Sequence, residues 1–388
     1  MEQKINICMI SGAYPPCRDG IGDYTAKLID SLDRENLEVS LITSNEAMIA
    51  KHIEENNIKR IFPIIKRWNI FATIAILKFI IKGKFDIVHL QFPSSRYKRT
   101  FSLCFLPLLS SVFLKKKTVL TLHEFSISYP INKFRQILLS LGSLRVIVTD
   151  DNEVKKLAAR LIAGERKTCF IPIGSNIDVS GYDLKEKEVF YKRIGLNEQA
   201  KIIAFFGFIH PNKGLECLLQ AIRRAINAGI SVQLLIVSQL DFVNNAYHGK
   251  IKRLIDSLRL DEFAFVTGYL PSQEVSRFLS FSDICVLPFT DGATLRRGTL
   301  MAALCHGKAI ISTKSNRYAP PQLIDKENIF LVPVNDVEKL EEAIKLLCSD
   351  NKIRSKIAEC AGRLSKDFSW DKISKMHREL YQKIMVNL

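Results

Sequence analysis

Unbroken runs of apolar residues alternate with amphipathic stretches along the first half of the chain. Runs of this kind predict strands at residues 5–11, 39–43, 87–92, 118–123 and 145–149. Amphipathic stretches such as 24–33 and 68–82 lie between them and predict helices. Strands that are apolar on both sides and separated by helices are typical of a parallel sheet covered on both faces. The first half therefore predicts a doubly wound α/β domain.

The same alternation restarts after a polar, charged segment at residues 178–200. The second series predicts strands at 202–207, 232–237, 264–267, 284–289, 309–312 and 329–332. It also predicts helices at 214–228, 250–257, 273–280 and 299–305, with closing helices from 337 onward. Ligands of open α/β folds bind outside the carboxyl ends of the strands. We therefore expect an α/β fold of two doubly wound Rossmann-like domains that face each other across a ligand-binding cleft.

Length and composition agree with a globular, two-domain protein. The chain has 388 residues, of which 47% are hydrophobic. Its nine cysteines are odd in number and form no CxxC pair, which excludes a disulfide framework and a zinc ribbon and favours a reducing, cytoplasmic setting. The longest uncharged apolar stretch, 101–114, is shorter than the roughly 18–20 residues that span a bilayer. The first apolar run is too short for a signal peptide.

Positive charge is concentrated in one part of the sequence. Residues 51–150 contain 17 Lys and Arg against 5 Asp and Glu, which is +12 of the total +16. Within this window the runs 65–84, 101–117 and 131–145 combine apolar residues with cations, as do segments that rest on anionic membranes. The alternative is an ordinary core with a solvated cationic face. No nucleic-acid-binding module is recognisable, so we expect no nucleic-acid partner.

Two features of the first domain are candidates for ligand contact. Gly20 and Gly22 follow the first strand in the loop that precedes a helix predicted to begin near Asp23, although the loop is not a GxGxxG dinucleotide fingerprint. His123 ends a strand, where it can contact a bound hydroxyl or titrate near neutrality. The alternatives are a tight strand-to-helix turn and a histidine satisfied by neighbouring groups. His89, one strand earlier, is interpreted as structural.

The second domain offers a candidate anion site. Lys213 is predicted just before a helix start, although a lysine at such a position is usually solvated. Arg296 and Arg297 immediately precede a second helix, whose first amides have no carbonyl partner within it. The residues that contribute those amides are Gly298, Thr299 and Leu300. The alternative is a basic surface loop.

At these segments the chain resembles the retaining glycosyltransferases of family 4, which have the GT-B fold. The likeness covers nearly the whole chain and rests on five segments in order. These are Tyr-Pro-Pro with Asp-Gly-Ile-Gly-Asp-Tyr (14–24), Thr-Leu-His-Glu (121–124), Ile-Pro-Ile-Gly-Ser-Asn-Ile (171–177), Gly207 with Lys213-Gly214, and Phe-Ser-Trp (368–370). The resemblance implies an N-terminal acceptor-binding domain (1–180), a C-terminal nucleotide-sugar-binding domain (195–365) and a C-terminal helix that returns to the first domain (366–388).

The resemblance also implies roles for single residues. Gly20, Gly22 and Gly207 approach the donor, His123 contacts the transferred sugar, and Lys213 stabilises the departing diphosphate. The family usually has two Glu separated by seven residues around the sugar and ribose, and here those positions hold Thr294 and Ala302. The Arg that often follows the glycine at 207 is Phe208. Arg296 and Arg297 are candidate substitutes for the missing cation.

These features predict a retaining, metal-independent glycosyltransferase that uses a nucleoside diphosphate sugar and no cofactor. The acceptor is expected to be a saccharide or a lipid-linked saccharide, at a site that is cytoplasmic and peripheral to the membrane. No DxD motif or cluster with metal-ligand spacing lies near the expected cleft, so protein groups are expected to meet the charge of the leaving group. Two alternatives stay open: a sugar-nucleotide epimerase of the same architecture, and a catalytically silent homologue that acts as a binding partner.

Overall fold

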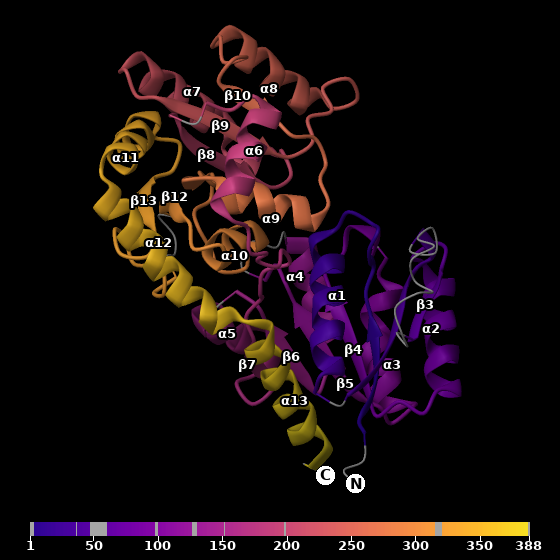
Figure 1. Ribbon diagram of the computed structural model, residues 1–388. Helices are drawn as coiled ribbons and strands as arrows, with labels where there is room; N and C mark the ends of the chain where they lie inside the picture. The colour runs from indigo at the N-terminus through magenta and orange to yellow at the C-terminus, as the bar shows by residue number, and fades with distance from the viewer. Residues whose placement is uncertain are drawn as a thin grey trace. The chain divides into compact units, whose positions relative to one another are not determined.

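The computed structural model describes residues 4–35, 37–46, 60–97, 100–125, 130–150, 152–197, 199–314 and 320–386. The chain divides into two compact units. Unit 1 comprises Met1–Gly174 together with Ser369–Leu388, and unit 2 comprises Ser175–Phe368. The C-terminal helix α13 (Trp370–Val386) therefore belongs to unit 1, where it packs against α1 (Gly20–Asp33) (Figure 1).

Unit 1 contains a seven-stranded sheet in the order β3-β2-β1-β4-β5-β6-β7, and every neighbouring pair is parallel. Its strands are β1 (Asn6–Ile10), β2 (Glu38–Ser44), β3 (Arg60–Ile65), β4 (Ile87–Phe92), β5 (Lys117–Leu122), β6 (Arg145–Val148) and β7 (Thr168–Phe170). The central strands β1 and β4 are almost wholly buried, as their apolar sequences require. The prediction of a parallel, doubly wound sheet is confirmed.

The helices of unit 1 cover both faces of this sheet. From β1 the chain steps in one direction to β2, and from β4 it steps in the other direction to β5 and β6. Right-handed crossovers therefore place α1 on the face opposite to α2 (Ile70–Lys82), α3 (Leu106–Val112) and α4 (Pro130–Leu141). Side chains of α2, α3 and α4 share one buried apolar cluster with the strands beneath them.

Unit 2 repeats the architecture with six parallel strands in the order β10-β9-β8-β11-β12-β13. The strands are β8 (Lys201–Phe206), β9 (Val232–Val237), β10 (Ala264–Val266), β11 (Ile284–Leu287), β12 (Ala309–Lys314) and β13 (Phe330–Pro333). Its helices are α7 (Leu215–Asn227), α8 (Ala246–Ser257), α9 (Ser272–Phe281), α10 (Gly298–Cys305), α11 (Val337–Ser349) and α12 (Asn351–Ser365). A separate buried apolar cluster confirms that this unit has its own core.

Each sheet has one point at which the strand order reverses. In unit 1 it lies between β1 and β4, and in unit 2 it lies between β8 and β11. Loops that leave the carboxyl ends of such a pair diverge to opposite faces and leave a crevice, which is where open α/β sheets bind ligands. The loops after β1, β4, β8 and β11 are therefore expected to bind ligands.

Several elements were not predicted, including the short helix α5 (Asn152–Ala158). β3 is an edge strand with Pro63 inside it, and β7 is a three-residue edge strand, so neither has a long apolar run. The predicted polar segment 178–200 contains α6 (Leu184–Ile194), a largely charged helix. Asp183 and Glu186 form a capping box at its start, the signal from which it could have been predicted.

Candidate functional site

In unit 2 the loop after β8 lies directly against the loop after β11. Gly207 has φ 123°, and a Cβ placed on it lies 2.7 Å from Cγ2 of Thr299. Gly214 has φ 66°, and a Cβ there lies 2.0 Å from the carbonyl oxygen of Pro288. The two positions therefore require glycine both for their backbone angles and for their close contacts. The sequence predicted Gly207 as a site residue, and the structure brings it against Thr299 of the predicted anion site.

A group of cations lies in this crevice around the ring of Phe289. Nζ of Lys213 is 5.1 Å from the ring centroid, and the guanidinium carbon of Arg297 is 3.9 Å from it. Asp291 forms an ion pair with Arg297 and a longer one, at 3.8 Å, with Arg296. Only 6% of the Arg297 side chain and 8% of the Arg296 side chain are exposed. The group, which we call the basic cluster, thus brings Lys213, Arg296 and Arg297 together around Phe289 and Asp291.

The charged forms of Lys213 and Arg297 in the basic cluster are disfavoured in the free protein. Burial, followed by the positive charge of Arg297, lowers the pKa of Lys213 to about 8, although Asp291 acts in the opposite direction. Burial likewise lowers the pKa of Arg297 to about 10, although the negative charge of Asp291 acts to raise it. Both shifts mean that the free protein holds these charges at a cost. A bound anion with more than one negative charge would remove that cost.

The start of α10 adds further donors at the same place. The amides of Gly298, Thr299 and Leu300 open the helix, and the side chain of Arg297, which precedes them, makes no capping hydrogen bond. The hydroxyl oxygens of Thr294 and Thr299 are buried and find no hydrogen-bond partner among the described residues. Buried polar atoms without partners are uncommon in proteins, and here they lie beside the basic cluster. The predicted donor-site residues of this unit are therefore brought together.

Sequence reasoning missed two members of this site, Phe289 and Asp291. Phe289 is 1% exposed, and its ring supports both Lys213 and Arg297. A phenylalanine at the end of an apolar run is predicted as core, so the pattern held no signal for this role. The carboxylate of Asp291 had one signal, because Asp-Gly followed by Arg-Arg in a loop suggests a local ion pair.

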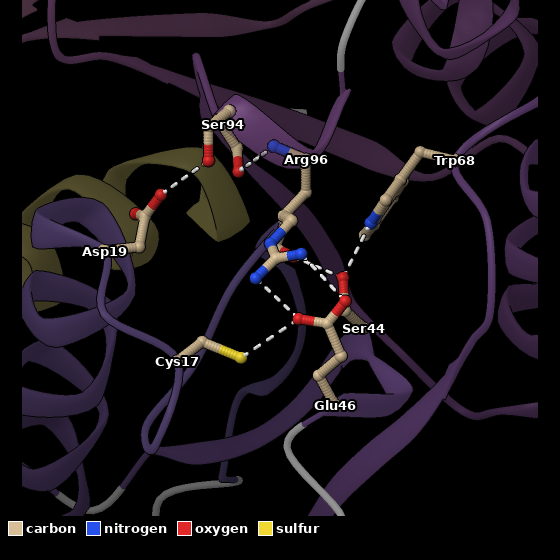
Figure 2. A network of polar contacts seen from close by, with 9 residues as sticks. Cys17, Asp19, Ser44, Glu46, Trp68, Ser94 and Arg96 are labelled. Atoms are coloured by element: carbon tan, nitrogen blue, oxygen red, sulfur yellow. Dashed lines mark hydrogen bonds and ion pairs between the residues drawn. The ribbon is translucent and has the colours of Figure 1, made fainter. Parts of the chain in front are cut away.

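In unit 1 the loop after β1 is held by a network of polar contacts (Figure 2). The two terminal nitrogens of Arg96, Nη1 and Nη2, contact the two carboxylate oxygens of Glu46. Sγ of Cys17 lies 3.7 Å from the same carboxylate. Oγ of Ser95 donates to Oδ2 of Asp19 at 3.1 Å. The network therefore joins the loop after β1 to the end of β2 and to the loop after β4. These contacts hold together the loops that leave β1 and β4, the two strands between which the strand order of unit 1 reverses.

The prediction that Gly20 and Gly22 precede the helix is wrong. The carboxylate of Asp19 accepts hydrogen bonds from the amides of Ile21 and Gly22, both at 3.0 Å, so α1 begins at Gly20. A Cβ on Gly22 would lie 3.1 Å from the backbone of Ala13, whereas one on Gly20 would meet nothing within 4 Å. Gly22 therefore lets α1 pack closely against the loop that contains Ala13. Gly20 has open space beside it, where a ligand can approach.

His123 follows β5 and is held in one orientation. Its Nε2 is 2.8 Å from Oε1 of Gln91, and because an amide oxygen only accepts, Nε2 carries the proton. Its ring packs edge-on against Tyr24, with centroids 4.7 Å apart. Burial lowers the pKa of His123 to about 3, so the ring is neutral and the expectation of titration near neutrality is wrong. Nδ1 therefore has a lone pair that can accept a hydrogen bond.

His89 is structural, as predicted. Its Nδ1 is 2.7 Å from the hydroxyl of Tyr381 in α13, and its Nε2 is 2.7 Å from Oγ1 of Thr121. Burial is the main cause that lowers its pKa well below the usual value, so it stays neutral. The C-terminal helix is thus bonded to the centre of the unit 1 sheet, directly beneath Gln91 and His123.

The described residues bear on two of the sequence predictions. Within them, no helix is both long enough and apolar enough to cross a bilayer. They also contain no group of three or more His, Cys, Asp or Glu side chains arranged to hold a metal ion. All nine cysteines are free thiols in the structure.

Residues 200–350 match the family model for glycosyl transferases group 1, a range that contains the whole basic cluster. A GDP-mannose-dependent monoacylated alpha-(1-6)-phosphatidylinositol monomannoside mannosyltransferase from Corynebacterium glutamicum is 25% identical over 249 residues. That similarity covers 61% of this chain and 61% of the relative, which is less than two thirds of either.

Solved structures resemble the whole chain. A glycosyltransferase from Rickettsia africae superposes with a TM-score of 0.78 at 19% identity, covering 100% of both chains. Anabaena HepE in complex with UDP and glucose has a TM-score of 0.78 at 15% identity, covering 98% of this chain and 100% of that one. At these identities the likeness concerns the fold. The fold is therefore the GT-B fold of two Rossmann-like domains, and unit 2 is similar to group 1 glycosyltransferases. Membership of the retaining family 4 stays a prediction.

Proposed function

We propose that this protein is a glycosyltransferase that moves a sugar from a nucleoside diphosphate sugar to a saccharide or lipid-linked acceptor. The observation that carries the proposal is the basic cluster, in which Arg296 and Arg297 pair with Asp291, and Lys213 lies over the ring of Phe289, beside the start of α10. A diphosphate offers negative charge to these three cations at once. The likeness of unit 2 to group 1 glycosyltransferases supports the same conclusion, as does the HepE structure with UDP and glucose.

The chemistry follows from where charge develops. As the bond between the sugar and the diphosphate breaks, negative charge grows on the leaving phosphate oxygen. Lys213, Arg297 and the first amides of α10 are in place before the reaction, so they stabilise that charge without reorganising. Each such donor contributes on the order of a few kcal/mol to the lowering of the barrier. Arg296 adds positive charge through its ion pair with Asp291.

The sugar is held by neutral groups in this proposal. Nδ1 of His123 accepts a hydrogen bond from a sugar hydroxyl, and Gly20 gives the donor room at the start of α1. The unpaired hydroxyls of Thr294 and Thr299 bond to the donor's oxygens. With Thr294 and the buried Ala302 in place of two carboxylates, ribose recognition differs from the family's usual pattern.

We propose transfer with retention of anomeric configuration and without a metal. On this route the leaving phosphate oxygen takes the proton of the acceptor hydroxyl on the same face of the sugar. The acceptor oxygen bonds to the anomeric carbon as the carbon–phosphate oxygen bond breaks. The protein therefore needs no carboxylate nucleophile, and its task is to stabilise the diphosphate. Cell-surface polysaccharide or glycolipid synthesis is the setting that the mannosyltransferase relative suggests.

A thermal-shift screen of nucleoside diphosphates and their sugars, followed by product analysis, tests the proposal. A donor at one hundred times its dissociation constant stabilises the folded state by about 2.7 kcal/mol. We expect one nucleotide series to raise the melting temperature, and its sugar to be transferred to a saccharide acceptor. Absence of any shift contradicts the proposal. Binding without transfer identifies a silent homologue, a possibility that Thr294 and Ala302 raise, and isomerised free donor identifies an epimerase.

Gln91 is predicted to matter because it orients His123. Changing Gln91 to Ala frees the imidazole to rotate or to change tautomer, so we expect kcat to fall about tenfold with a small change in KM for the donor. Gln91→Glu keeps the acceptor but adds a negative charge that raises the pKa of His123, so its activity should gain a pH dependence that the parent lacks. The measurement is steady-state kinetics across pH.

Gln233 offers the matched control for this experiment. It is also a buried glutamine, in unit 2, and its Oε1 accepts from the amide of Asn197 at 2.7 Å. Gln233→Ala should alter stability and leave kcat unchanged. Equal kinetic losses in the two alanine variants, with no new pH dependence in Gln91→Glu, would show that Gln91 is merely structural.

The acceptor proposal includes an anionic membrane surface met by residues 51–150. Residues 51–59, 98–99 and 126–129 of this window lie outside the described residues. The helices α2, α3 and α4 lie within it, and each has exposed apolar side chains.

A further inference from the structure

The outward faces of α2, α3 and α4, three of the helices that cover one side of the unit 1 sheet, are apolar. In α2 the side chains of Ala72, Ile76 and Ile80 are buried against the sheet. On its other side, Phe71 is 73% exposed and Ile81 is 63% exposed. A helix on the surface of a globular protein normally places polar residues on that outer side. This helix is apolar on both sides.

The next two helical segments show the same pattern. Four large apolar side chains in and beside η4 (Ser102–Phe105) and α3 are exposed, and these are Phe105, Leu108, Val112 and Phe113. Four in α4, at spacings of three and four residues, are exposed as well, and these are Ile131, Phe134, Ile137 and Leu141. Phe113 is 74% exposed and Leu141 is 61% exposed, so these are not side chains tucked against the core.

The three segments pack side by side, so their outer side chains form one surface. Oγ1 of Thr73 in α2 is 3.1 Å from Oγ of Ser102 in η4. The rings of Phe101 and Phe134 are 6.5 Å apart, which joins the start of η4 to α4. After α4, the backbone of Gly142 approaches the backbone of α3 closely. We call the exposed apolar side chains of α2, η4, α3 and α4 together the apolar face.

The charges at the apolar face have one sign. The sequences of α2, η4, α3 and α4 contain no Asp or Glu, and Glu124 is the only acidic residue between Asp86 and Asp150. Exposed cations lie along α2 and at the adjoining ends of the helices, and these are Lys66, Arg67, Lys78, Lys82, Lys84 and Lys115. Large apolar side chains combined with cations, without anions, are typical of segments that lie in the interface of an anionic bilayer.

We propose that the apolar face docks onto a lipid bilayer that carries anionic headgroups, with Phe71, Phe113 and Leu141 among the side chains that enter the interface. A second copy of the chain is a poorer occupant, because a symmetric contact through this face brings the lysines of the two copies towards each other. The contact lies at the surface of the bilayer, since none of the described helices is able to cross it. The inference uses no donor, so it stands or fails separately from the proposed transferase activity.

Vesicle binding by the full chain tests the proposal. The probes are vesicles of phosphatidylcholine alone and vesicles that also contain phosphatidylglycerol, separated from free protein by flotation. We expect strong binding to the second kind and at least about tenfold weaker binding to the first, with loss of much of this difference at high salt. Equal partition to the two kinds of vesicle overturns the proposal.

Matched variants locate the contact. Phe71→Asp with Phe113→Asp is expected to reduce binding to anionic vesicles by at least about tenfold. The control is Phe242→Asp with Val243→Asp, since these residues are 54% and 81% exposed and belong to unit 2. Lys78→Glu with Lys82→Glu should weaken binding, whereas Lys352→Glu with Lys356→Glu, an equal change of net charge on α12, should weaken it much less.

Two outcomes overturn the proposal at this stage. One is an equal loss of vesicle binding in the test variants and their controls. The other is self-association without lipid that Phe71→Asp abolishes in sedimentation velocity, which would make the apolar face a contact between copies. Because all the changed side chains are exposed, the melting temperature should stay that of the parent, and it serves as the folding control.

Discussion

Changing Lys213 to Met is expected to lower the rate of sugar transfer by a factor of about 100 to 1000 while the free protein becomes no less stable. Methionine keeps the length of the side chain and its packing on Phe289 but removes the charge. The transition state loses one donor to the departing diphosphate. The free protein loses a buried ammonium that Arg297 repels, and so gains or keeps stability.

The pH dependence of binding gives the same variant a second readout. In the free protein the pKa of Lys213 is about 8, below its ordinary value, so the charged form is disfavoured there. A bound diphosphate favours the charged form and raises this pKa. Above the second pKa of the UDP phosphate, which is about 6, affinity for UDP should therefore be constant up to about pH 8 and fall as the pH rises further, because binding must then take up a proton. Calorimetry should find a flatter profile with Lys213→Met.

Lys308 supplies a matched control. Burial lowers its pKa to about 8 as well, but its Nζ donates to the carbonyl oxygens of Ser280 at 2.7 Å and Ser282 at 2.9 Å. Lys308→Met leaves these two carbonyls without their donor, so it should lower the melting temperature and leave the rate per folded molecule unchanged. If both variants lose stability and keep their rates, the basic cluster is not the diphosphate site.

The sequence predicted most of the fold because its strands are buried on both faces. β4 and β9 coincide with mainly apolar runs, interrupted only by His89 and Gln91 in the first and by Gln233 in the second. β3 and β7 escaped prediction because they are edge strands, where burial is slight. α6 escaped because its sequence is largely charged, although Phe190 and Tyr191 within it are buried. Hydrophobic patterns reveal which segments are buried, so they do not predict a strand or helix that buries few apolar side chains.

The candidate site was predictable in its charged members and not in their partners. Lys213, Arg296 and Arg297 stand out in a sequence because cations beside glycines and a helix start suggest an anion. Gln91 carries no such signal. It comes to face His123 only because β4 and β5 pair in register, with Gln91 beside Thr121. The neutral state of His123 was hidden for the same reason, since burial depends on the elements around it.

Exchanging Gly214 for Ala is the change we expect to destabilise unit 2 most, by about 3 kcal/mol or more. The residue has φ 66°, and the added Cβ would lie 2.0 Å from the carbonyl oxygen of Pro288, which is backbone and has no side chain that could turn aside. Gly229→Ala is the control. Gly229 has φ 80° at the other end of α7, where an added Cβ meets nothing within 4 Å. Gly229→Ala should therefore lower the free energy of unfolding only by the strain of a left-handed backbone, about 1 kcal/mol.

Urea unfolding of the two variants separates the energy of the clash with Pro288 from the energy of the strained backbone. Since both glycines have left-handed backbone angles, the difference between the two losses of stability measures the clash with Pro288 alone. The clash also has a functional consequence. Pro288 precedes Phe289, on whose ring Lys213 and Arg297 both pack, so a displaced Pro288 disturbs the basic cluster. Gly214→Ala should therefore weaken UDP binding in the molecules that remain folded, whereas Gly229→Ala should not. Equal stability losses and equal UDP affinities would mean that the two loops do not need their close approach to form the site.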